Sequence, residues 1–329
     1  MKMHASRRFQ LATSIAALIF FASGSTVHSA DTRRIPRSAL PDVRSLDTIE
    51  QREMPRVDAQ RLLAEDAELR RSNVPAPTRY AVNHPVALTP DTSGTWETLD
   101  DGSRLWRLRL SSPGALSMSL GLEQFDLPEG VTFWVHAPDG SGVQGPYTAE
   151  DRNALGGLWT AVVLGDELVA ELHAPAIGPL DLRISSVSHG YREFGERADD
   201  AFPEKRGSCN INVVCSQGNR FADQIRSVAR YTFSDGTGSY VCTGQLINNT
   251  SEDETPYLYS AGHCVQSDTE AATVVAYWNY QTATCEEFSG GGLSQNQSGA
   301  TLIAHSFDSE TDFQYDFALL ELDEFPDDA

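Results

Sequence analysis

Between residues 96 and about 187, polar and apolar side chains largely alternate along short runs of the chain. In the run at 104–110 (RLWRLRL), arginines separate the leucines, which is the period-two pattern of a β-strand with one buried face. Turn-forming Pro, Asp and Gly residues separate this run from similar ones. The other runs lie at 116–122, 131–136, 158–164, 168–173 and 180–187. Several short strands joined by such turns predict a β-sandwich for residues 96–191.

A different period precedes this region. Leu62, Leu63 and Leu69 recur at roughly helical spacing within residues 58–71. Asp58 is placed to act as the N-cap, and Pro75 lies just beyond the expected end of the helix. The sequence therefore predicts that residues 31–95 form a polar segment with one short helix.

The alternation is lost again in residues 192–206 (REFGERADDAFPEKR), which are charged and end in a Lys-Arg pair. Exposed, polar, proline-containing linkers are preferred sites of proteolysis, so we expect a processing linker here. From residue 207 onward, short apolar runs return between Gly- and Ser-rich loops and predict a second β-region. These runs lie at 228–233, 241–248, 257–261, 273–280, 301–304 and 317–322.

The first 30 residues have the pattern of a signal peptide. Lys2, Arg7 and Arg8 precede an apolar run at 11–22, and small residues follow up to Ala30. This run is shorter than the roughly 20 apolar residues that span a bilayer, which disfavours the alternative of an uncleaved anchor. We therefore predict secretion, extracellular or periplasmic, with no membrane partner.

Charge and cysteine usage narrow the possible functions. The chain has 46 acidic and 25 basic residues, so a polyanion such as nucleic acid is not an expected partner. In an exported protein, cysteines that cluster in one region predict disulfides there, and an odd count leaves one cysteine without a partner in this chain. Zinc is the alternative, but the sequence has no Cys-x-x-Cys pair, and we expect no metal or cofactor. The five cysteines are Cys209, Cys215, Cys242, Cys264 and Cys285.

Two residues of the second region are candidates for catalysis. His263 follows a predicted strand in the motif 260–264 (SAGHC), and Asp316 opens the apolar run 316–320 (DFALL). Each alone is more often structural. Together they match a serine-hydrolase pair, because a serine hydroxyl becomes nucleophilic only when a neutral imidazole takes its proton, and a buried carboxylate must hold that imidazole in one tautomer. We predict that His263 is the base and that Asp316 orients it.

The second region resembles the start of a trypsin-fold serine protease, and within that fold most closely the lysyl endopeptidase family. The resemblance extends over nearly all of residues 207–329. Upstream, the chain resembles the family's pro-region more loosely, at 159–160 (WT), 165–167 (GDE) and 171–172 (EL). The motifs that carry it are 207–215 (GSCNINVVC), 242–244 (CTG), 248–250 (NNT), 260–264, 277–280 (YWNY) leading to Cys285, and 316–322 (DFALLEL).

The resemblance implies an all-β protein with a β-sandwich-like pro-domain at 96–191. The polar pro-segment 31–95 would precede it. After the processing linker, residues 207–329 would form the incomplete N-terminal part of the protease domain, the first six-stranded barrel of a trypsin-like two-barrel protease.

The same resemblance implies the disulfides Cys242–Cys264 and Cys215–Cys285. It pairs Cys209 with the missing C-terminal barrel. It also places the catalytic serine, in a Gly-x-Ser-Gly motif, beyond residue 329. The chain alone is therefore expected to be inactive.

Of Ser141 and Gly262, only Gly262 departs from the family pattern. Ser141 lies in a Gly-Ser-Gly context at 140–142, but it precedes His263 and follows a predicted strand, so we interpret it as part of a hairpin turn. Gly262 stands where related proteases carry a larger residue, and we expect no effect on the chemistry.

The sequence thus predicts the precursor of a secreted serine endopeptidase that cleaves protein or peptide substrates after a basic residue. The resemblance favours lysine. Lys205 at the processing linker agrees with self-cleavage after lysine, but Arg206 is an equally good cleavage point, so arginine stays open. The alternative is a non-catalytic exported binding or adhesion protein built on the same folds. A Gly-x-Ser-Gly motif downstream of residue 329 would favour the enzyme.

Overall fold

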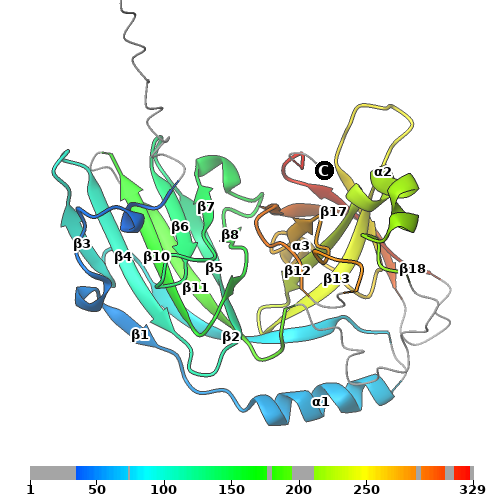
Figure 1. The fold of residues 1–329 in the computed structure, drawn as a ribbon, viewed down its shortest axis with the longest axis horizontal. Helices are drawn as coiled ribbons and strands as arrows, with labels where there is room; N and C mark the ends of the chain where they lie inside the picture. Colours follow the sequence, from blue (N-terminus) through cyan, green and yellow to red (C-terminus); the bar gives the residue numbers. More distant parts are fainter. Residues whose placement is uncertain are drawn as a thin grey trace, which may run out of the picture. The chain divides into compact units, whose positions relative to one another are not determined.

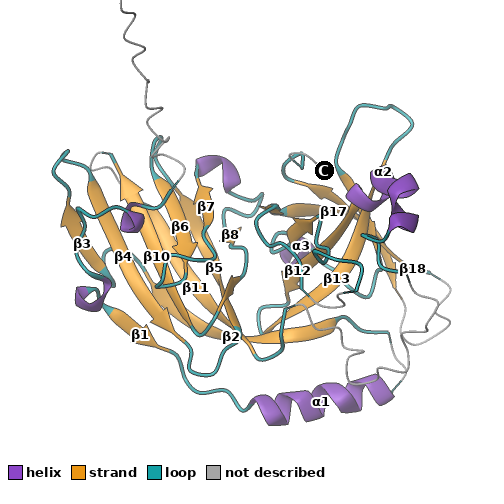
Figure 2. Cartoon of the chain, viewed as in Figure 1, coloured by secondary structure: helices purple, strands orange, loops and turns teal. Residues whose placement is uncertain are grey.

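The computed structural model describes residues 35–72, 75–175, 180–194, 211–286, 290–307 and 315–326. The predicted signal peptide 1–30, residues 195–206 of the predicted linker and Cys209 lie outside these described residues. Strands dominate the fold, as Figure 2 shows, which confirms the all-β class. No helix within the described residues is long and apolar enough to cross a membrane.

The N-terminal part of the fold consists of two packed β-layers (Figure 1). One sheet has the order β1-β4-β10-β6-β7, with β3 paired to β4, and the other contains β2, β11, β5 and β8 in that order, with β9 paired to β5. The strands are β1 (Gln51–Glu53), β2 (Thr78–Leu88), β3 (Thr95–Thr98), β4 (Arg104–Ser111), β5 (Ser117–Asp126), β6 (Thr132–His136), β7 (Gln144–Tyr147), β8 (Leu158–Trp159), β9 (Val163–Leu164), β10 (Glu167–Ala174) and β11 (Asp181–Gly190).

The alternating residues of the predicted strands fill the space between these layers. Leu108, Leu120, Phe133 and Ile184 are all completely buried in one apolar cluster that draws on both sheets. Burying such side chains contributes roughly 1.5–3 kcal/mol each. The prediction of a sandwich-like all-β region from the period-two pattern is therefore confirmed.

The polar positions of the same strands are less exposed than alternation suggests. Arg107 and Glu171, which are paired across β4 and β10, are almost fully buried. Glu171 accepts a hydrogen bond from the backbone nitrogen of Ser38 at 3.0 Å, and Arg107 donates one to the carbonyl of Arg44 at 2.7 Å. The chain between residues 35 and 48 thus covers this face of the sheet. Arg107 and Glu171 are buried because this segment lies over them, and both are hydrogen-bonded to it.

The predicted helix is present as α1 (Ala59–Arg71). The side chain of Asp58 accepts a hydrogen bond from the backbone nitrogen of Arg61 at 3.0 Å, which satisfies one of the free N–H groups of the first turn. Leu62 and Asp66 are the buried residues of this helix. The expected N-cap is confirmed, and the helix presents one apolar and one charged side chain to the interior.

The C-terminal part of the described chain is a nearly closed barrel. Its strands pair in the order β16-β15-β12-β13-β14-β18-β17, and β16 continues into β17 after Gly299. Tyr231, Leu258 and Leu320 are completely buried in its core. The strands are β12 (Val228–Ser234), β13 (Gly238–Ile247), β14 (Tyr257–Ser260), β15 (Val275–Trp278), β16 (Asn296–Ser298), β17 (Ala300–Phe307) and β18 (Asp316–Leu322), with short helices α2 (Ala222–Arg226) and α3 (Asp268–Ala271).

One strand belongs to both parts. The first residues of β2 pair with β13 of the barrel, and its later residues pair with β11 of the sandwich (Figure 1). The sequence predicted no strand here, and these residues were expected to belong to the polar segment 31–95. The reason is physical, because β2 changes its neighbours along its length and so shows no single alternating pattern of burial.

Candidate active site

His263 lies in the turn that follows β14. The strand ends at Ser260, and the backbone nitrogen of Cys264 donates to the carbonyl of Ala261 at 3.2 Å, which closes the turn. Cys264 is bonded to Cys242 of β13, so a disulfide fastens the turn to the neighbouring strand. We call residues 261–264 the His263 turn.

Asp316 reaches the same place from the other side. It is the first residue of β18, which runs antiparallel to β14 and pairs Ala318 with Ser260. In an antiparallel pair, the end of one strand lies beside the beginning of its partner. The pairing therefore brings together two residues that are 53 positions apart in the sequence.

The Asp316 carboxylate makes two hydrogen bonds to His263. Its Oδ2 accepts from the ring Nδ1, and its Oδ1 accepts from the backbone nitrogen of the same residue, both at 2.8 Å. A proton on Nδ1 leaves Nε2 as the basic nitrogen of the neutral ring. The side chains of His263 and Asp316 are 20% and 27% exposed. The pair is thus fixed in one geometry and tautomer while staying within reach of solvent.

These contacts also set the charge of the acid. Partial burial alone would raise the pKa of the Asp316 carboxyl, but hydrogen bonds from the His263 ring and backbone lower it further than burial raises it. The pKa of Asp316 therefore lies below its usual value, and the group is ionised at neutral pH. An ionised acceptor at Nδ1 is what a histidine base requires when its ring becomes positively charged.

Both predicted disulfides are present. Cys242 bonds to Cys264, and Cys215 bonds to Cys285. Potential metal-binding atoms of Cys242, His263 and Cys264 lie within 4.8 Å of one another. Zinc binds cysteine as the thiolate, and the disulfide leaves no thiolate at this place. The cluster is therefore part of the histidine's support and does not fit a zinc site.

Two sequence models of one protein family match the chain. The one described as "Lysyl endopeptidase, C-terminal domain" matches residues 204–329, and the one described as "Lysyl endopeptidase N-terminal domain" matches residues 52–191. The chain belongs to the lysyl endopeptidase family. A curated lysyl endopeptidase of Pseudomonas aeruginosa is 31% identical to it over 256 residues, which are 71% of this chain and 52% of that protein. The chain thus spans about half the length of this relative.

Gly262 has a packing role beside the candidate site that the sequence did not reveal. A Cβ atom at Gly262 would lie 2.5 Å from the carbonyl oxygen of Ser306 and 2.8 Å from that of Phe317. Both are backbone atoms of strands β17 and β18, so neither can move easily. Glycine lets the His263 turn lie close against the strand that begins with Asp316.

Ser141 is part of a turn, as expected. The side chain of Asp139 accepts hydrogen bonds from the Ser141 backbone nitrogen at 2.9 Å and from its hydroxyl at 2.6 Å. The Ser141 carbonyl accepts from the backbone nitrogen of Ala137 at 2.9 Å, which closes the loop after β6. This serine belongs to a hairpin on the sandwich.

A serine–histidine pair that the sequence did not indicate lies inside the sandwich. The hydroxyl of Ser112 is 2.7 Å from Nδ1 of His189. Both residues are buried, at 0% and 1% exposed, so no substrate could reach them. Burial lowers the pKa of His189 to about 4, which keeps the ring neutral. We interpret this pair as structural.

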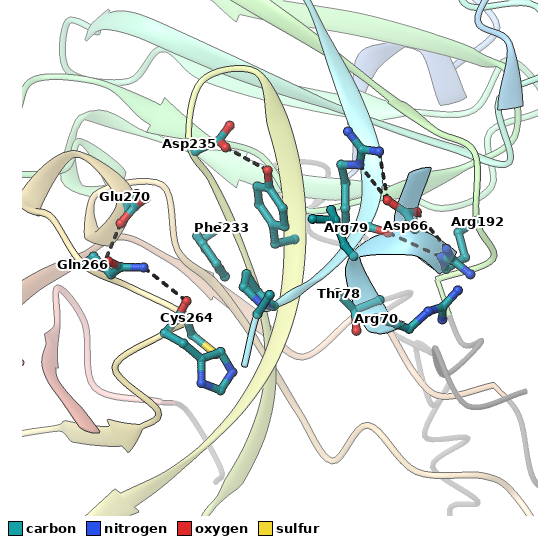
Figure 3. Close-up of a pocket in the computed structure, with 15 residues that line it drawn as sticks. Asp66, Arg70, Thr78, Arg79, Arg192, Phe233, Asp235, Cys264, Gln266 and Glu270 are labelled. Atoms are coloured by element: carbon teal, nitrogen blue, oxygen red, sulfur yellow. Dashed lines mark hydrogen bonds and ion pairs between the residues drawn. The ribbon is translucent and has the colours of Figure 1, made fainter. Parts of the chain in front are cut away.

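A cavity of about 350 Å³ adjoins the His263 turn (Figure 3). The barrel contributes the His263 turn, the residues that follow the turn and the β12–β13 hairpin to the cavity wall. Gln266 and Asp235 are among these residues. From the N-terminal region come residues of α1 and the beginning of β2, including Asp66 and Arg79. The candidate site is thus bordered by residues from the regions that both family models match, an arrangement for which the sequence carried no signal.

Proposed function

We propose that this chain is the N-terminal part of the precursor of a secreted serine endopeptidase, in which His263 is the general base and Asp316 orients it. The observation that carries the proposal is the pair of 2.8 Å hydrogen bonds between these two residues. Membership of the lysyl endopeptidase family supports the class of reaction. A non-catalytic binding protein would have no need for an imidazole held in a single tautomer.

In the proposed reaction, Nε2 of His263 takes the proton of a serine hydroxyl while the serine oxygen bonds to the scissile carbonyl carbon. His263 then gives that proton to the leaving amine as the peptide C–N bond breaks. A water molecule then attacks the acyl-serine carbonyl carbon while Nε2 of His263 takes its proton. His263 returns that proton to the serine oxygen as the acyl–serine bond breaks. Among the described residues, no serine hydroxyl is hydrogen-bonded to the His263 ring. We propose that the complete protein supplies the serine from beyond residue 329.

The other partners follow from this proposal. Substrates would be proteins or peptides, cut after a basic residue, and similarity to a lysyl endopeptidase favours lysine. Cys209 would form a disulfide with a C-terminal barrel, and residues 1–329 alone would be inactive. The proposed chemistry needs only amino-acid side chains. Cleavage after Lys205 or Arg206 would separate the pro-domain from the protease.

Replacing the proposed base tests this function. In the complete protein, His263→Ala should lower kcat/KM for a lysyl peptide substrate by about 10⁴-fold or more, because no group would remain to take the serine proton. His305→Ala is the matched control, since His305 lies on β17 of the same barrel and is exposed. Its kcat/KM should stay near that of the wild type. Retention of activity in correctly folded His263→Ala would refute the assignment.

A further inference from the structure

We propose that Asp66 is a latch that holds the beginning of β2 beside His263, so that the N-terminal domain restricts access to this histidine. The regulatory meaning of such a latch rests on the proposed function, because access matters only if His263 is the base. Accessibility itself can be measured without any proteolysis.

The beginning of β2 lies against the strand that supports the His263 turn. Thr78 pairs with Val241, and Arg79 pairs with Tyr240, at the edge of β13. The next residue of β13 is Cys242, whose disulfide carries the turn. The residues that precede Thr78 therefore continue from this pairing toward the histidine.

The same residues line the cavity in which His263 lies. Ala76 and Pro77 contribute to its wall together with His263. An extended peptide commonly binds a protein by adding to a free strand edge. Here β2 occupies the edge of β13 at residues 238–241. A peptide that approached His263 along β13 would have to displace β2.

One buried carboxylate fixes the start of β2. Oδ1 of Asp66 accepts hydrogen bonds from Nε and one terminal nitrogen of Arg79, at 3.1 and 2.8 Å. Its Oδ2 accepts from the hydroxyl of Tyr191 at 2.7 Å and from a terminal nitrogen of Arg192 at 2.8 Å. Figure 3 shows Asp66 between the two arginines. A single side chain thus joins α1, β2 and the residue at which the predicted processing linker begins.

Among these residues, Asp66 is the one whose loss should most weaken the contacts that hold the start of β2. It is 8% exposed, and its single negative charge is paired with the guanidinium groups of both Arg79 and Arg192. Removing one member of a buried ion pair leaves an uncompensated charge and disrupts the local structure. Glu65 also binds Arg79, at 3.2 Å, but its side chain is 43% exposed, and such an ion pair is weakened by solvent. Glu65 therefore provides a matched control.

The test measures how fast the ring of His263 reacts with diethyl pyrocarbonate at pH 7 in the full chain. The reagent transfers an ethoxycarbonyl group to a neutral, accessible imidazole nitrogen, and peptide mass spectrometry reads each histidine separately. Asp66→Asn should raise the rate constant at His263 roughly fivefold or more, because the opened state becomes more populated. Glu65→Gln should leave the rate constant within about twofold of the wild type.

Two buried histidines of the sandwich report on folding in the same experiment. His136 and His189 are each 1% exposed and should stay unreactive in every variant that is folded. If Asp66→Asn exposes them, Arg192→Lys is used in its place. Arg192 donates from one terminal nitrogen to Asp66 at 2.8 Å and from Nε to the carbonyl of Arg79 at 3.4 Å. Lysine keeps the positive charge but lacks this planar array of donors. That variant should raise the rate constant at His263 at least about twofold.

An unchanged rate constant at His263 in a folded latch variant would overturn the proposal, and so would an equal increase in Glu65→Gln. Neither result depends on peptide hydrolysis. If the reaction rate of His263 does not change, the proposal that His263 is the base is unaffected. If His263 proves not to be the base, the measured effect of Asp66 on its accessibility still holds.

Discussion

The Asp316 carboxylate makes contact with both the ring and the backbone of a single residue. The ring contact could be predicted, because a histidine after one strand and an aspartate at the start of another suit a serine hydrolase. The backbone contact and the packing of Gly262 could not be. They depend on how closely β14, β17 and β18 approach one another, and no local sequence pattern encodes that distance.

His189 gives a prediction at the same scale. Burial lowers its pKa from 6.5 in the unfolded chain to about 4 in the folded one. Between these values the unfolded state binds more protons, so the free energy of unfolding should fall as pH falls from 6.5 toward 4. For this group the loss amounts to about 3 kcal/mol. Urea denaturation followed by tryptophan fluorescence at several pH values would measure it.

The variant His189→Gln isolates this contribution, since its side chain is polar but does not titrate. The free energy of unfolding of the variant should depend less steeply on pH between 6.5 and 4 than that of the wild type. His84, whose pKa burial also lowers, would account for part of the slope that remains. An identical pH dependence in the two proteins would show that His189 is not the buried neutral group described here.

At the scale of elements, the sequence predicted strands whose residues form alternating or apolar runs. β4, β5 and β10 in the sandwich and β12 and β18 in the barrel are of this kind. β2 was missed because it pairs first with the barrel and then with the sandwich, so its burial follows no single period. Long-range pairing of this type leaves no local signature in the sequence.

Helix α1 was predicted together with its cap, and its stability can be tested directly. Asp58→Ala should lower the free energy of unfolding by about 1 kcal/mol, because a backbone N–H of the first turn loses its acceptor. Asp58→Ser should recover most of that loss, since serine is also a good N-cap. Urea denaturation of the three proteins would measure the differences. Equal stability of Asp58→Ala and the wild type would mean that the cap contributes nothing.

For the molecule as a whole, the sandwich and the barrel share a sheet and line one cavity beside His263. The sequence suggested two regions separated by a charged linker, and the family comparisons match each region with its own domain model. It gave no sign that the regions share a strand. That relation depends on β2 and on Asp66, whose partners are 13 and 125–126 residues away in the chain.

The proposed reaction depends most on Asp316 as the group that orients the proposed base His263, and isosteric replacement of Asp316 is the most direct test. In the complete protein, Asp316→Asn should lower kcat for a lysyl peptide by about 10⁴-fold, because the amide cannot hold the ring in the required tautomer or stabilise its charge. Glu321→Gln, a charge-neutralising change further along the same strand, should keep kcat within about twofold of the wild type. A kcat for Asp316→Asn equal to that of Glu321→Gln would contradict the account.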